Sequence, residues 1–168
     1  MTKCYRHIAP SEVGTGFVFI CPGQREEINN RPCAGQTGEV LEIGLRVMNR
    51  LDSKMFPYTD RYQYHITNAW SLVEYPRKTG RSVPKKSEVC DVVNLRRLHL
   101  EIRDLECVIV CGAKARDAVS ACIEEFGFAG KVAYAKHTSR RALGFPTNES
   151  LPQVMNTWAQ AIIFQLQT

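Results

Sequence analysis

Three short segments of this 168-residue chain contain residue types that can carry out chemistry. The first, residues 21–38, is rich in Gly and Pro and holds the adjacent carboxylates Glu26 and Glu27. Unpaired backbone amides in such a loop suit a phosphate or an anionic base. The second segment ends at Asn68, whose amide offers both a donor and an acceptor, enough to read the edge of a pyrimidine. The third holds His137 within a basic loop.

Each of these segments also has an ordinary structural explanation. A Gly- and Pro-rich loop is usually a turn, an Asn at a strand end usually caps the backbone, and a His in a loop is usually a solvated surface group. The elements that position the three segments therefore matter to the interpretation.

Apolar runs predict strands at 16–21, 62–68, 107–111 and 131–134. Apolar residues at helical spacing predict helices at 38–51, with Thr37 as N-cap, and at 87–105, 112–126 and 152–167. This alternation predicts one α/β domain over residues 1–168, a three-layer α/β/α sandwich with a central, mostly parallel four-stranded sheet. Ligands bind such sheets at the carboxyl ends of the strands, and the three segments each follow a predicted strand.

Composition limits the class of protein. An apolar fraction of 44% excludes a largely disordered chain, and the net charge of +5 permits a polyanionic partner without requiring one. None of the seven cysteines forms a C-x2-C pair, so we expect no metal site. The apolar neighbours of Cys107, Cys111 and Cys122 predict that these three are buried apolar residues. The chain lacks a recognisable leader and an apolar run of about 18 residues, so we expect a cytoplasmic protein without membrane contact.

The order and spacing of the motifs resemble the uracil-DNA glycosylase superfamily over roughly residues 16–145. The matching positions are Pro22-Gly23, Arg31-Pro32, Gly35, Gly38, Ile66-Thr67-Asn68, the buried strand with its turn at 108–115, and His137 with Ser139. The resemblance implies a monofunctional DNA glycosylase that cleaves the N-glycosidic bond of a pyrimidine flipped out of DNA. It also implies that Asn68 selects the base and that a neutral His137 donates to the departing base.

The resemblance assigns the remaining positions to base and DNA contacts. Backbone amides around Pro22, Gly23 and Gln24 would help to hold the base and the sugar phosphate. The residues expected to contact DNA are Arg31, Ser139, Arg140, Arg141, and Arg77 and Lys78 of the basic segment 71–86. That segment is predicted to be an exposed loop, and its alternative role is a solubilising surface.

Two departures from the family pattern shape the functional hypothesis. Phe19, Ile20 and Cys21 stand where relatives carry a water-positioning carboxylate or Asn, so either Glu26 or Glu27 has taken that role or the chemistry is weak or absent. Cys33 stands where relatives place an aromatic residue that stacks on uracil, which removes a stacking face and opens space. We therefore expect a base bulkier than uracil, such as a modified phage cytosine, removed in DNA repair or in defence.

We expect no cofactor and a monomeric protein with DNA as its partner. The subgroup of the superfamily that holds an iron–sulfur cluster needs four cysteines, and this chain offers only Cys4 and Cys90 near the expected places. One alternative is a catalytically silent DNA-binding module of the same fold. Another is a small-molecule nucleotide-binding protein, but the chain lacks the phosphate loop G-x-x-x-x-G-K-[ST].

Overall fold

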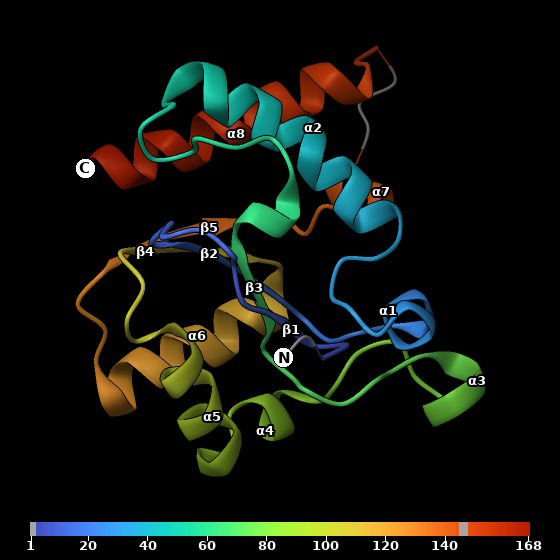
Figure 1. Ribbon diagram of the computed structural model, residues 1–168. Helices are drawn as coiled ribbons and strands as arrows, with labels where there is room; N and C mark the ends of the chain where they lie inside the picture. The colour runs from blue at the N-terminus through green and yellow to red at the C-terminus, as the bar shows by residue number, and fades with distance from the viewer. Residues whose placement is uncertain (1–2, 145–147) are drawn as a thin grey trace.

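The computed structural model describes residues 3–144 and 148–168 and has helices on both faces of a five-stranded sheet (Figure 1). The strand order is β1-β3-β2-β4-β5; β1 pairs antiparallel with β3, and the other neighbours are parallel. The strands are β1 (Arg6–His7), β2 (Thr15–Phe19), β3 (His65–Asn68), β4 (Cys107–Cys111) and β5 (Lys131–Ala135). The predicted three-layer α/β/α architecture is confirmed, with five strands in place of four.

One face of the sheet is covered by α2 (Gln36–Leu51) and α8 (Leu151–Gln167), and the other by α4 (Lys86–Val89), α5 (Val92–Ile102) and α6 (Ala113–Phe126) (Figure 1). Side chains alternate between the two faces of each strand. Phe17 and Phe19 of β2 therefore pack in the core toward α2 and α8, whereas Val18 packs in the core toward α5 and α6. All residues of β2 and β4 are buried, as expected for central strands of a sheet covered on both faces.

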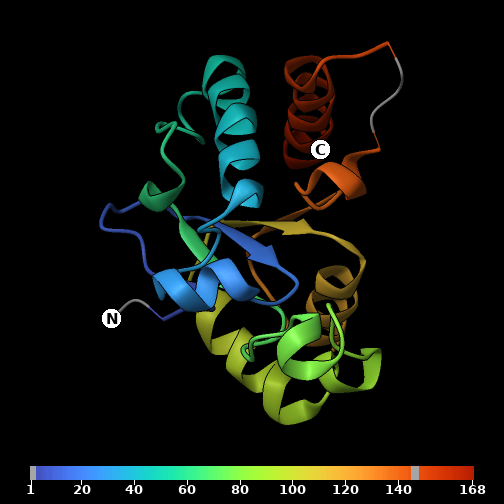
Figure 2. The same cartoon turned by 90° about the vertical axis from the view of Figure 1, so that its right-hand side faces the viewer.

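The shorter elements gather at the carboxyl ends of the parallel strands. They are α1 (Gln24–Asn29), α3 (Pro76–Thr79) and α7 (Arg140–Leu143), and Figure 2 looks onto this end of the sheet. The 3-10 helix η1 (Arg61–Gln63) precedes β3. None of the helices in residues 3–144 and 148–168 has the length and apolar character needed to cross a membrane.

Several sequence-based boundaries were wrong. The strand expected at 62–68 divides into η1 and β3, the helix expected at 87–105 divides at Cys90-Asp91 into α4 and α5, and α2 starts after Gly35, which replaces Thr37 as N-cap. The segment 71–86, expected to be a loop, contains α3 and the start of α4. The antiparallel strand β1 was not predicted.

The outer edge of β5 is covered by one side chain of α8. The Gln165 amide accepts a hydrogen bond from the Tyr134 N–H (2.9 Å) and donates one to the Tyr134 carbonyl (3.0 Å). Gln165 therefore forms the pair of bonds that a residue of a further strand would form at this position.

Candidate active site

The three segments singled out in the sequence line one cavity of about 420 Å³ at the carboxyl end of the sheet. Gly23, Glu26 and Cys33 come from the first segment, Asn68 from the second and His137 from the third. Because β2, β3 and β5, the strands that lead into these segments, run parallel in one sheet, their loops open on the same side of it.

Asn68 is the last residue of β3 and is paired in register with Phe19 on β2. Its side chain is buried, and its Nδ2 donates a hydrogen bond to the Tyr5 carbonyl at 3.0 Å. A carboxamide has two N–H groups and a carbonyl. Within residues 3–144 and 148–168, the second N–H and Oδ1 of Asn68 form no further bond, so both are available at the cavity wall.

His137 follows β5 and packs edge-on against Phe19, with ring centroids 5.5 Å apart. Its Nδ1 accepts a hydrogen bond from the Ser139 N–H at 3.1 Å. Burial lowers the pKa of His137 from 6.5 to about 4, since a charged imidazolium is poorly solvated there. The imidazole is therefore neutral at pH 7, and because Nδ1 is an acceptor, the ring proton is on Nε2.

The loop that carries His137 is fixed from three directions. The Thr138 hydroxyl is buried and donates to the Thr37 carbonyl at the start of α2 (2.9 Å). The Ser139 hydroxyl caps α7 by accepting from the Ala142 N–H, and Trp158 on α8 donates to the Lys136 carbonyl (3.0 Å). The Thr138 hydroxyl thus anchors the loop to the start of α2.

The structure separates the two adjacent carboxylates. Glu26 lines the cavity, and its Oε2 accepts from the Gly23 N–H at 3.0 Å, which caps α1. Glu27 lies outside the cavity lining, where it is ion-paired with Lys78 and accepts a hydrogen bond from the Tyr75 hydroxyl (2.8 Å). These contacts lower the pKa of Glu27. Glu26 is therefore the better placed of the two to act on a ligand in the cavity.

The backbone of Pro22, Gly23 and Gln24, expected to hold a base, offers few free N–H groups to the cavity. Pro22 has no N–H and its carbonyl accepts from the Glu74 N–H, while the Gly23 N–H is bonded to Glu26. Gln24 is exposed and does not line the cavity. Of the three residues, only Gly23 contributes to the cavity wall.

Cys33 is buried in the wall and has a positive φ of 51°. The Tyr62 hydroxyl donates to the carbonyls of Pro32 (2.9 Å) and Cys33 (3.4 Å), and a Cβ on Gly38 would lie 2.0 Å from the Cys33 carbonyl oxygen. A glycine at 38 thus permits the tight approach of the Cys33 turn to α2. Burial raises the pKa of the Cys33 thiol well above its usual value, so it is a neutral, small wall residue.

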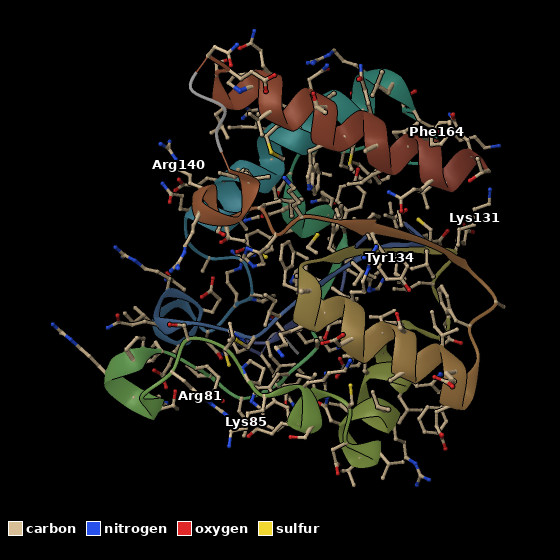
Figure 3. All side chains as sticks on the ribbon, turned by 180° about the vertical axis from the view of Figure 1, so that it is seen from behind. Arg81, Lys85, Lys131, Tyr134, Arg140 and Phe164 are labelled. Atoms are coloured by element: carbon tan, nitrogen blue, oxygen red, sulfur yellow. The ribbon has the colours of Figure 1, made fainter. Side chains whose placement is uncertain are left out.

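The residues expected to contact DNA occupy different environments. Ser139 and Arg141 line the cavity, and Arg140 extends outward from α7 (Figure 3). Arg31 lies over the Tyr62 ring at 3.4 Å. Arg77 is exposed on α3, and Lys78 is ion-paired with Glu27.

The structure adds three contributions to the cavity for which the sequence suggested no role. Phe19 forms part of the wall, a position that its parallel register with Asn68 could have indicated. Glu74 is buried there and its pKa is lowered to about 2, chiefly by Arg81, which also pairs with Glu88. Ser82 and Val83 also line the cavity. The last two contributions depend on a folded loop for which the sequence gives no periodic signal.

Comparison with known proteins adds no assignment: no family model matches this chain, and no curated protein matches it.

Proposed function

We propose that this protein is a DNA glycosylase that hydrolyses the N-glycosidic bond of a pyrimidine nucleotide flipped out of DNA into the 420 Å³ cavity. The observation that carries the proposal is the convergence of Glu26, Asn68 and His137, from three segments far apart in sequence, on that cavity. Such an activity serves DNA repair or defence against modified foreign DNA.

Base recognition is assigned to Asn68 and Phe19. The free N–H and Oδ1 of Asn68 match the acceptor and donor that neighbour each other on a pyrimidine edge. Because the Tyr5 carbonyl accepts from the same amide, the orientation of the carboxamide is set before the base enters. The Phe19 ring supplies an aromatic wall one strand away from Asn68.

Cleavage leaves negative charge on the departing base and positive charge on the sugar. The Nε2–H of neutral His137 can donate a hydrogen bond to the base oxygen on which this charge develops. A donor that is fixed before the reaction stabilises such charge strongly, and removal of one typically costs 100-fold or more in rate (order of magnitude). The bonds of Thr138 and Ser139 hold the imidazole in place.

The role of positioning the attacking water is assigned to Glu26. Its Oε2 is bonded to the Gly23 N–H, whereas Oε1 has no partner within the part of the chain that the structure describes. An ionised carboxylate oxygen at the cavity wall can accept a proton from water and also face the cationic sugar.

The substrate is proposed to be a modified pyrimidine bulkier than uracil. The small Cys33 side chain in the wall leaves room that an aromatic residue would fill. A volume of about 420 Å³ is within the range of pockets for whole ligands.

The test is excision from short duplexes that carry uracil, 5-hydroxymethylcytosine or glucosylated cytosine, with abasic sites detected by alkaline cleavage. We expect release of at least one modified cytosine, faster than release of uracil. His137→Ala should lose about 100-fold or more in rate, and His137→Asn, which keeps an N–H donor, should lose less. If the parent protein releases none of these bases, the proposal is wrong.

A second candidate, a catalytically silent DNA-binding module, is favoured by one observation. Phe19, Ile20 and Cys21 line the cavity where a water-positioning group is expected, and the Cys21 thiol is held protonated by a pKa raised to about 12 by burial. DNA binding by the parent without release of any base would support this candidate.

A further inference from the structure

A second cavity of about 580 Å³ lies directly beside the first, at the carboxyl ends of β4 and β5. Ile20, His137 and Ala142 line both cavities, so the wall between them is one side chain thick at His137. The first cavity takes one nucleotide in the proposed function, and nothing in that function uses the second.

The second cavity combines apolar walls with a stacked cation. Ile20, Ala113 and Ala142 provide apolar surface. The guanidinium carbon of Arg116 lies 4.6 Å from the centre of the Tyr134 ring. Tyr134 projects from β5 beside α6 (Figure 3), and its hydroxyl is 3.2 Å from the Ser120 hydroxyl, which fixes the ring.

The charge at this cavity is suited to a nucleic acid strand. Arg116 and Lys136 line it, and neither forms an ion pair with a carboxylate of residues 3–144 and 148–168. The one carboxylate in the lining, Asp117, is 3.4 Å from the Lys86 ammonium.

We propose that this cavity binds a second nucleobase, the neighbour of the extruded nucleotide in the same strand, stacked on Arg116 and Tyr134. The inference rests on the proposed function and adds that the protein engages DNA whose neighbouring base is unstacked, as in a single strand. Planar bases stack on aromatic rings and on guanidinium planes, and Ile20 and Ala113 give the apolar surroundings that a base needs. The apolar part of the wall suits the base itself, and Arg116 and Lys136, which form no ion pair within the described residues, suit the phosphates that flank it.

The test measures binding of fluorescent single-stranded oligonucleotides that carry a central tetrahydrofuran abasic analogue, so the identity of the excised base is not required. In two further probes, the nucleotide on either the 5′ or the 3′ side is also replaced by tetrahydrofuran, which removes the neighbouring base but keeps the sugar and phosphate. We expect one of these replacements to weaken binding by the parent about fivefold or more.

Variants assign that loss to the second cavity. In Arg116→Ala and Tyr134→Ala the same replacement should make little further difference, whereas Tyr134→Phe, which keeps the ring, should behave as the parent. Arg103→Ala is the matched control, because Arg103 is an exposed arginine that pairs with Asp104 outside both cavities.

Equal binding of all probes by a parent that excises a base would overturn this inference and leave the proposed function intact. A loss in Arg103→Ala equal to that in Arg116→Ala would overturn it too. A parent that neither binds the probes nor excises any base would overturn both proposals.

Discussion

At the scale of single residues, Glu26 and Glu27 show how two neighbours of the same type acquire different roles. Glu26 lines the cavity with one oxygen on the Gly23 N–H, whereas the carboxylate of Glu27 is taken up by Lys78 and Tyr75. The sequence contains the pair but cannot rank its members, because the difference depends on the placement of residues about 50 positions further along the chain.

Glu26→Gln should lower the excision rate about 100-fold or more, because the amide cannot accept a proton from water. The glutamine carbonyl can still accept from the Gly23 N–H, so the melting temperature should change little. Glu27→Gln, the adjacent change outside the cavity lining, is the control and should keep near-parent rates. Equal losses in the two variants would contradict the assignment of the water to Glu26.

The buried imidazole of His137 makes stability depend on pH. Its pKa is about 4 in the folded protein against 6.5 for an ordinary His, so between these values the unfolded chain binds the extra proton. The stabilisation is therefore complete above about pH 6.5 and is lost as pH falls toward 4. Between pH 7 and pH 4.5, urea unfolding should show a loss of stability about 2–3 kcal/mol larger in the parent than in His137→Asn.

The same pKa bears on the rate. With His137 neutral down to about pH 4, excision should show no loss of activity near pH 6.5 from protonation of this residue. An acid limb centred near pH 6.5 that disappears in His137→Asn would contradict a low pKa for this imidazole.

At the scale of elements, the start of α2 depends on a close contact between backbone segments. Gly38→Ala would place a Cβ 2.0 Å from the Cys33 carbonyl oxygen, so the Cys33 turn or the helix must move. We expect a loss of about 3 kcal/mol or more in unfolding free energy and a distorted cavity. Gly35→Ala, whose Cβ would lie 3.3 Å from Cβ and Cγ of Arg25, needs a much smaller adjustment and should be far milder. Similar losses in both, measured by denaturant unfolding, would contradict this account.

The segment from Glu74 to Glu88 is held by one arginine. Arg81 contacts both Glu74 oxygens and also pairs with Glu88. Glu74→Gln removes a buried charge and leaves Arg81 partly unpaired, so we expect a loss of about 2–3 kcal/mol and faster proteolysis of residues 74–88. Glu124→Gln, on α6 away from this network, should cost little. A proteolysis rate unchanged in Glu74→Gln would show that other contacts hold the segment.

Sequence patterns predicted the elements whose signals are local. β4 is a continuous apolar run and α8 has regular apolar spacing, so both were found. β1 has only two residues and exists because β3 lies beside it, which no local pattern reveals. The five Lys and Arg residues of segment 71–86 predict an exposed basic loop. In the structure, one of them, Arg81, is ion-paired with two carboxylates, Glu74 and Glu88, of the same part of the chain. The site was predictable as three segments, but the contribution of Glu74 required the fold.

At the scale of the whole molecule, the sheet ends at β5 because α8 occupies the edge. Gln165→Leu should leave the Tyr134 N–H and carbonyl unpaired, at a cost of about 1–3 kcal/mol. The freed edge should also favour pairing between copies of the chain. Gln160→Leu, on the exposed side of the same helix, is the matched control. Unfolding and light scattering measure the two effects, and identical behaviour of both variants would contradict the role of Gln165.

The hydrogen bond from Thr138 to Thr37 spans 101 residues of chain. During synthesis on the ribosome, the first hundred or so residues can form strands and helices, but the final wall of the cavity does not yet exist. Contacts with such wide sequence separation form late because closure of a long loop costs entropy. A nascent chain should therefore complete this cavity in one late step, once the segment that carries Thr138 has emerged.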